Sequence, residues 1–214
     1  MRSPSTDSLR LNRAQREAVE SGDGPLLVLA GAGSGKTRVI THRIAWLVQR
    51  GVPAGAIVAL TFTNRAASEM RERVVQILGG QPGRDLGESG ALTVSTFHAF
   101  GLTVLGKERS AIGGRFTIFD QGDQTALVKQ LLRAAGADRS YDAQAVLARI
   151  SNAKNAFLRT EDLPAREGDV YDEITKAIFP RYQAALSQFR AFDFDDLVCE
   201  VARLWNERVD IRTR

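Results

Sequence analysis

The sequence predicts an α/β protein in which an incomplete parallel sheet carries an all-helical insertion. Between residues 11 and 106, short β-rich apolar runs alternate with segments whose apolar residues recur at helical spacing. From about residue 107 to residue 190 the pattern is almost entirely helical, and an amphipathic pattern resumes at residues 195–205. Strands that alternate with helices favour right-handed crossover units and therefore a parallel sheet.

The first predicted elements are a short helix, an apolar strand and a longer helix. Asn12 can cap the first helix, and Gln15, three residues later, completes a capping-box pattern. Residues 26–30 form a continuous apolar run, which is typical of a buried parallel strand. A Gly-rich loop follows. Residues 37–50 then place apolar side chains on one helical face, and Gly51 ends that helix.

The order of strand and then helix repeats along the next part of the chain. Residues 57–61 predict a second strand, and residues 64–78 predict a helix with one apolar face. Residues 79–90 are rich in Gly and Pro and predict a loop. Residues 92–96 predict a third strand that leads into another helix. Three strands of one parallel sheet are therefore expected.

The helical part contains a short β-rich stretch at residues 116–119. Apolar periodicity predicts its helices over residues 125–135, 143–157 and 170–189. Pro180 lies inside the last of these and should kink or split it, because proline lacks the N–H and clashes with the preceding turn.

These patterns divide the chain into three parts. We expect residues 1–107 to form the N-terminal part of a sheet domain and residues 108–190 to form the helical insertion. Residues 191–214 would return to the first domain.

Composition describes an ordinary globular protein with a small positive charge. Hydrophobic residues make up 43% and charged residues 25% of the 214 residues. The net charge of +4 permits a polyanionic partner but does not require one. The single cysteine, Cys199, excludes an intrachain disulfide, and we expect a buried, inert thiol. No apolar run approaches the ~20 residues that span a bilayer, so we expect a cytoplasmic protein.

The Gly-rich segment after the first predicted strand has the form of a Walker A phosphate loop. It comprises Ala30, Gly31, Ala32, Gly33, Ser34, Gly35, Lys36 and Thr37. Glycines let the backbone curl so that its N–H groups point inward, and the following helix adds its positive end. Lys36 would neutralise the β- and γ-phosphates, and the Thr37 hydroxyl would bind Mg²⁺. The segment therefore predicts a binding site for ATP with Mg²⁺. The alternative interpretation is a Gly-rich turn in which the lysine has no function.

Four further segments indicate which kind of nucleotide-binding protein this is. Residues 11–15 contain Gln15, whose amide can pair with the edge of adenine. Residues 61–70 follow the second strand, residues 96–100 follow the third, and residues 192–197 follow the helical part. In this order and spacing, these segments and the phosphate loop resemble the UvrD/Rep/PcrA family of superfamily 1 DNA helicases. The resemblance covers residues 11 to about 206. It implies a RecA-like P-loop NTPase sheet and an ATP-dependent helicase that moves 3′ to 5′ on DNA.

The resemblance also implies roles for individual residues. Gln15 would read adenine, and Arg38 would lie beside the nucleotide. Phe62 and Phe194 would stack on bases of single-stranded DNA, an interaction worth ~1–3 kcal/mol per base in any sequence. The residues that would contact phosphate or sugar are Thr63, Asn64, Thr96 and His98. The implied partners are single-stranded DNA, junctions of single- and double-stranded DNA, and accessory repair or replication proteins, with no membrane.

Each of these residues has a purely structural alternative. Gln15 could serve only in the capping box. Phe62 follows an apolar strand and could pack in the core, and His98 could be a buried imidazole with its hydrogen bonds satisfied. The acidic residues Asp193, Asp195 and Asp196 could suggest a metal site. A helix that begins at Asp193, with the other carboxylates favouring its N-terminal dipole, is the simpler interpretation.

The sequence does not show the acidic groups that hydrolyse ATP. Hydrolysis needs an aspartate for Mg²⁺, an acid that aligns the attacking water, and arginines that stabilise the developing charge. No apolar strand in these 214 residues ends in Asp-Glu. In the family that motif follows the segment corresponding to residues 192–197, so we expect an N-terminal fragment that is inactive alone. A P-loop phosphotransferase, a DNA-binding module without ATPase activity and a regulatory paralogue are the other interpretations.

Overall fold

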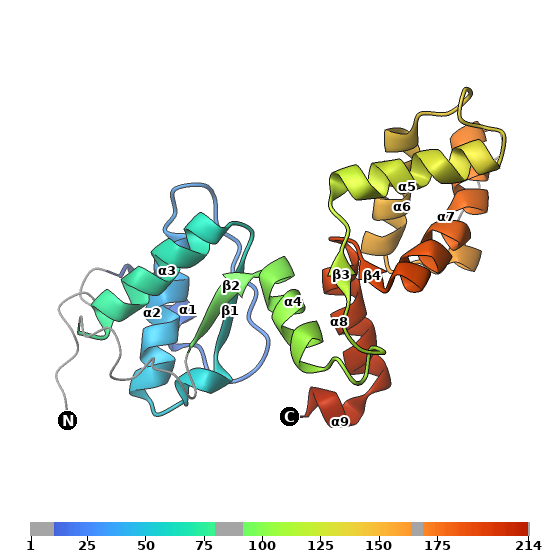
Figure 1. Ribbon diagram of the computed structural model, residues 1–214. Coiled ribbons are helices and arrows are strands. Elements are labelled where there is room, and N and C mark those ends of the chain that lie inside the picture. The colour runs from blue at the N-terminus through green and yellow to red at the C-terminus, as the bar shows by residue number, and fades with distance from the viewer. Residues whose placement is uncertain (1–10, 80–91, 164–168, 214) are drawn as a thin grey trace. The chain divides into compact units, whose positions relative to one another are not determined.

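The computed structural model describes residues 11–79, 92–163 and 169–213, and the chain forms two compact units (Figure 1). The units are Met1–Phe97 and His98–Arg214. The division therefore falls ten residues earlier than the expected boundary at residue 107. Residues 191–214 group with the helical part. Of the loop predicted at residues 79–90, all but Gly79 lies outside the described residues.

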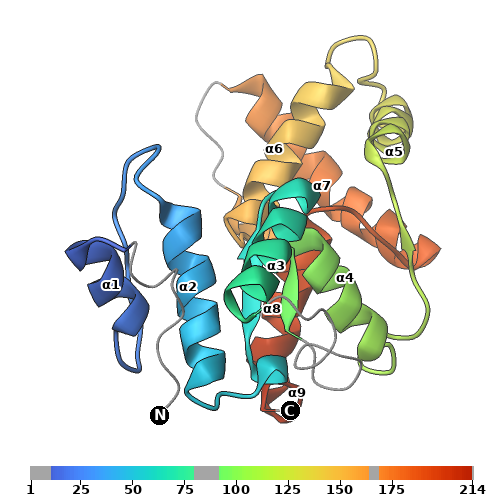
Figure 2. The same ribbon diagram turned by 90° about the vertical axis from the view of Figure 1, so that its left-hand side faces the viewer.

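The N-terminal unit combines helices with a pair of parallel strands. Its elements are α1 (Arg13–Glu20), α2 (Lys36–Gln49), the 3₁₀ turn η2 (Ala54–Ala56), β1 (Val58–Thr61), α3 (Asn64–Ile77) and β2 (Thr93–Thr96). The strands pair in parallel, with Val58 opposite Thr93 and Thr61 opposite Thr96. This pairing confirms the strands predicted at residues 57–61 and 92–96. Helix α3 packs against both strands and against α2, and α1 lies alongside α2 (Figure 2).

One apolar core holds α2, α3 and the two strands together. Its buried members are Ile44, Ile57, Ala59, Ala67, Met70, Val74, Leu92 and Val94. Burial of one aliphatic side chain of this size contributes about 1.5–3 kcal/mol. A ladder of two short strands is marginal by itself, so packing by α2 and α3 is what stabilises the pair.

The first predicted strand, at residues 26–30, is wrong. These residues belong to no strand, and the side chains of Leu27 and Leu29 are 82% and 87% exposed. An extended apolar segment becomes a strand only when a neighbouring backbone pairs with its N–H and C=O groups. Within the described part of the chain, β1 and β2 pair only with each other. The phosphate loop therefore does not follow a strand in the described part of the chain.

The second unit contains a helical bundle and a short parallel strand pair. Its elements are α4 (Phe97–Lys107, with Phe97 the last residue of the first unit), β3 (Thr117–Ile118), α5 (Gln121–Ala134), α6 (Ala143–Asn155), η3 (Thr160–Asp162), α7 (Val170–Phe189), β4 (Ala191–Phe192), α8 (Asp196–Glu207) and α9 (Val209–Arg212). Helices α5, α6 and α7 pack against one another, and α8 packs against α6. The predicted helices are confirmed. No helix of the described residues is long and apolar enough to cross a membrane.

Pro180 was predicted either to kink or to split the helix that contains it, and it does not split α7. The helix runs as a single element from Val170 to Phe189. Ile178, Phe179 and Tyr182, which flank the proline, are buried in the bundle core. Tertiary packing on both sides therefore keeps the helix continuous despite the missing N–H.

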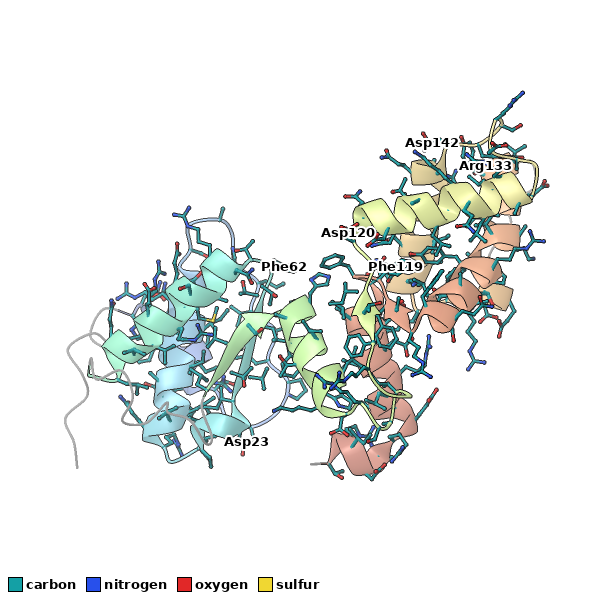
Figure 3. All side chains as sticks on the ribbon, viewed as in Figure 1. Asp23, Phe62, Phe119, Asp120, Arg133 and Asp142 are labelled. Atoms are coloured by element: carbon teal, nitrogen blue, oxygen red, sulfur yellow. The ribbon has the colours of Figure 1, made fainter. Side chains whose placement is uncertain are left out.

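Aspartate caps set the starts of all three bundle helices, with Asp120 before α5, Asp142 before α6 and Asp169 before α7. Asp120 accepts a hydrogen bond from the backbone N–H of Asp123, and Asp142 accepts from the N–H groups of Gln144 and Ala145 (Figure 3). These bonds satisfy N–H groups that a helix start leaves without partners. Helix α5 accordingly begins at Gln121, four residues before the predicted start, because apolar periodicity does not register a polar first turn.

Helices α4 and α8 approach closely at Gly101. A Cβ atom added there would overlap the carbonyl oxygen of Leu197. Leu105 of α4 and Leu197 and Val201 of α8 are buried together beside this contact. The glycine lets the two backbones meet, which fixes the start of α4 relative to the residues that precede α8.

Candidate nucleotide and nucleic-acid sites

The phosphate loop curls through backbone conformations that favour glycine. Gly33 and Gly35 have φ values of 75° and 87°, in the left-handed region. The Ser34 hydroxyl donates to the carbonyl oxygen of Gly31 at 2.7 Å and closes the turn. Helix α2 begins directly after Gly35. The first N–H groups of any α-helix lack intrahelical partners, so this helix start can donate to an anion held in the loop.

Lys36 is folded back onto its own loop. Its Nζ donates to the carbonyl oxygens of Ala30 and Gly31 at 2.9 and 2.8 Å. The lysine is exposed, as is Thr37 beside it, while Arg38 is half-buried. Phosphate oxygens are charged acceptors and bind an ammonium more strongly than neutral carbonyls do. The lysine is therefore held where it can transfer its hydrogen bonds to a bound phosphate.

Gln15 both caps α1 and contacts the phosphate loop. Its Oε1 accepts from the Asn12 N–H at 3.1 Å, and Asn12 Oδ1 accepts from the Gln15 N–H at 2.9 Å, which confirms the capping box. Its Nε2 donates to the carbonyl oxygen of Ser34 at 3.0 Å. A Cβ atom at Gly35 would lie only 2.9 Å from this nitrogen. Gln15 therefore can take part in the capping box and contact the phosphate loop at the same time. Its predicted contact with adenine stays a prediction.

Arg43 of α2 secures the helix that carries Gln15. Its Nη1 donates to the carbonyl oxygens of Val19 and Ser21 at 3.1 and 2.9 Å, and to that of Ala18 at 3.3 Å. These are orphan carbonyls at the C-terminal end of α1. The sequence did not predict the contact between Arg43 and the end of α1, because the local sequence around an arginine in a helix does not indicate which distant carbonyl groups its side chain will contact.

An exposed aromatic pair stands at the carboxyl ends of β1 and β2. Because Thr61 is opposite Thr96, the next residues, Phe62 and Phe97, are neighbours, with ring centroids 5.6 Å apart. Phe62, labelled in Figure 3, is 89% exposed, so the core-packing alternative for it is wrong. Phe97 was missed although it lies between two predicted contact residues.

The polar residues beside this pair differ in exposure. Thr63 caps α3 through its Oγ1, which accepts from the Ala66 N–H at 3.1 Å, and Asn64 is the exposed first residue of that helix. Thr96 is buried at the end of β2. Their predicted contacts to phosphate or sugar remain predictions.

A second exposed aromatic pair lies in the C-terminal unit. The rings of His98 and Phe194 meet edge to face with centroids 5.9 Å apart, and Phe194 is 47% exposed. His98 is exposed as well, so the alternative of a buried imidazole is wrong. Each unit thus contains an exposed pair of rings: Phe62 contacts Phe97 in the first unit, and His98 contacts Phe194 in the second.

Residues 11–214 of the chain match a family model described as "UvrD/REP helicase N-terminal domain". The chain belongs to this family. It is 41% identical over 208 residues to the ATP-dependent DNA helicase PcrA of Leuconostoc citreum, covering 95% of this chain and 27% of that protein. The PcrA of Bacillus subtilis is 41% identical over 200 residues, covering 92% and 26%. The PcrA of Staphylococcus epidermidis is 38% identical over 203 residues, covering 93% and 27%.

The chain therefore spans about a quarter of the length of the curated relatives it matches. Membership of the UvrD/REP helicase family implies a P-loop NTPase fold. The described helices and parallel strand pairs are compatible with that α/β class.

The acidic run of this UvrD/REP helicase domain forms a buried ion-pair network. Lys154 Nζ lies 2.6 Å from Asp193 Oδ2 and 2.9 Å from Asp196 Oδ1, and the Tyr182 hydroxyl donates to Asp193 Oδ2 at 3.0 Å. Asp193 Oδ1 also accepts from the Asp196 N–H, the first of α8. Asp193 thus precedes the helix it was predicted to begin. Sequence reasoning missed Lys154 and Tyr182, which lie 39 and 11 residues from Asp193.

Burial shifts the titration of two groups in this region. It raises the pKa of Asp196 to about 6, although the charge of Lys154 opposes the shift. Burial likewise raises the pKa of the Cys199 thiol to about 11, in keeping with the inert thiol expected from the sequence. Among the described residues, no group of three or more His, Cys, Asp or Glu side chains is arranged to hold a metal ion.

Proposed function

We propose that this chain is the nucleotide-binding and DNA-contacting part of an ATP-dependent DNA helicase that moves 3′ to 5′. The family of the chain supports this proposal, and so does its similarity to proteins named ATP-dependent DNA helicase PcrA. A RecA-like first motor domain would comprise residues 1–107 and 191–214, and residues 108–190 would be its helical insertion. The observation that carries the proposal is the position of Lys36, hydrogen-bonded across a glycine loop at the start of α2.

The donor groups of the loop fit a nucleoside triphosphate. Backbone N–H groups, a helix start and an ammonium group all favour phosphate oxygens. Mg²⁺ would be held by the Thr37 hydroxyl together with phosphate oxygens, and it would neutralise charge on the phosphate that is transferred. Gln15 contacts the loop at Ser34, and it would bind the base of the same nucleotide.

The two aromatic pairs suit single-stranded DNA. Phe62 and Phe194 expose ring faces on which any base can stack, so binding would not depend on base sequence. His98 and the polar residues Thr63, Asn64 and Thr96 would position the strand through phosphate and sugar. Junctions of single- and double-stranded DNA would be the substrates of the whole protein, with accessory repair or replication proteins as further partners.

Replacing Lys36 tests the assignment of the loop. Lys36→Ala removes a charge-assisted contact, which contributes about 1.5–3 kcal/mol, so the Kd for Mg²⁺-ATP should rise about 10- to 150-fold. Titration of a fluorescent ATP analogue measures the change. Lys129→Ala is the matched control, because it removes the same charge from an exposed position on α5. Equal affinity in the two variants would show that the loop is a Gly-rich turn with an incidental lysine.

A further inference from the structure

The turn that carries Phe194 is held on both sides of the ring. Phe194 is exposed, whereas Asp193 before it and Asp196 after it are buried. Lys154 binds both of these aspartates. The Asn155 side chain donates from Nδ2 to Asp195 Oδ1 at 2.9 Å. Consecutive residues at the end of α6 therefore fix the backbone on either side of one exposed aromatic ring.

Stability alone does not account for this network. The three charged side chains are 2% to 5% exposed, and removing charges from water costs several kcal/mol per ion. Well-packed apolar residues of similar volume are often as stabilising as such an ion pair. The network does impose one geometry, because the lysine nitrogen, the tyrosine hydroxyl and the Asp196 N–H all meet the carboxylate of Asp193.

We propose that Lys154 is a positioning residue for Phe194, assisted by Asn155 and Tyr182. It holds the turn so that the Phe194 ring stands exposed against His98 and stacks on a base of single-stranded DNA. A ring on a loose turn would lose conformational entropy on binding, and a ring fixed in advance avoids that cost. This inference rests on the role proposed above for Phe194.

A second ion pair on the same helix provides a matched control. Arg149 of α6 pairs with Asp169 and Asp172, each at 3.3 Å, and so also ties α6 to α7. These contacts lie at the start of α7, and the partners of Arg149 are not residues of the turn. Arg149→Met should therefore reduce stability without changing the placement of Phe194.

The experiment measures binding of a labelled single-stranded oligonucleotide by fluorescence anisotropy, at one salt concentration, for the 214-residue chain. Lys154→Met should weaken binding about two- to tenfold. In the Phe194→Ala background the same substitution should have no further effect, because there is no ring left to position. Arg149→Met should bind like the parent. Thermal unfolding of every variant identifies any that fail to fold.

Asn155→Ala keeps the inference testable if Lys154→Met fails to fold, since Asn155 is exposed and leaves the buried ions paired. It should weaken binding less than Lys154→Met, and again only when Phe194 is present. If Phe194→Ala weakens binding but Lys154→Met and Asn155→Ala do not, the positioning role is wrong and the DNA contact stands. Additive losses in the double variants would also overturn it. If Phe194→Ala has no effect, the proposed contact itself fails, and the inference fails with it.

Discussion

Phe62→Ala separates a DNA contact from a packing role, because the ring of Phe62 is 89% exposed. A buried phenylalanine costs about 3–5 kcal/mol when it is truncated to alanine. Among the described residues the ring of Phe62 instead pairs with that of Phe97, with centroids 5.6 Å apart, and such pairs contribute about 0.5–1.5 kcal/mol. The free energy of unfolding should therefore fall by no more than about 1.5 kcal/mol.

The effect of the same substitution on DNA should be larger. Stacking contributes about 1–3 kcal/mol per base, which corresponds to an increase in Kd of about 5- to 150-fold. Every base offers a ring face, so the loss should be similar for oligonucleotides of different composition. Binding should also weaken with salt in both proteins, because the phosphate contacts remain.

The assay pairs urea unfolding with oligonucleotide titration at fixed salt, and Phe189→Ala is its control. Phe189 is 59% exposed and has a ring partner, Phe119, at 5.7 Å, so its loss removes a comparable ring from the bundle. Phe189→Ala should leave DNA affinity unchanged. Stability that falls in Phe62→Ala without a change in DNA affinity would refute the stacking role. A loss confined to one base composition would show that Phe62 reads base edges.

Two further predictions concern Gln15 and Asp196. Gln15→Ala should lower the free energy of unfolding by about 0.5–1.5 kcal/mol, because the Asn12 N–H loses its side-chain acceptor while Asn12 still caps the helix. It should also reduce the preference for ATP over GTP, and an unchanged ratio of the two Kd values would leave Gln15 with its structural role alone. Burial raises the pKa of Asp196 from 3.8 to about 6, so the folded protein holds this proton more tightly than the unfolded chain does. The stability from this group is complete below pH 3.8 and is lost as pH rises through about 6. Urea unfolding across that range should show the decline, and Asp196→Asn should flatten it; identical profiles would contradict the shift.

Local patterns predicted the elements that depend on local forces. The helices carry their own periodicity, and the capping box at Asn12 and Gln15 needs only four consecutive residues. The strand predicted at residues 26–30 failed because strand formation depends on a partner elsewhere. An apolar run can indicate that a segment suits a sheet, but it cannot show that a neighbouring strand is present to pair with it.

The candidate sites divide in the same way. The segment of the phosphate loop is contiguous in sequence, so its glycines and lysine predict a nucleotide site without knowledge of the fold. The partners of the acidic run could not, since Lys154 is 39 residues from Asp193 and 42 from Asp196. A lysine in a helix is usually solvated, and nothing in its neighbourhood indicates that folding will bury it between two carboxylates.

Phe62 and Phe194 were predicted from the resemblance of their segments to the helicase family, whereas Phe97, which occupies a similar position, was missed. Phe62 directly follows β1, Phe97 directly follows β2, and Phe194 comes two residues after β4. Side chains just past the carboxyl end of a parallel strand are free of the ladder, and this edge is where ligands of α/β sheets bind. Register then decides which rings meet: Thr61 opposite Thr96 makes neighbours of Phe62 and Phe97. An apolar run followed by an aromatic residue did not by itself distinguish an exposed ring from a packed one, because strand pairing and register decide which rings meet at this edge.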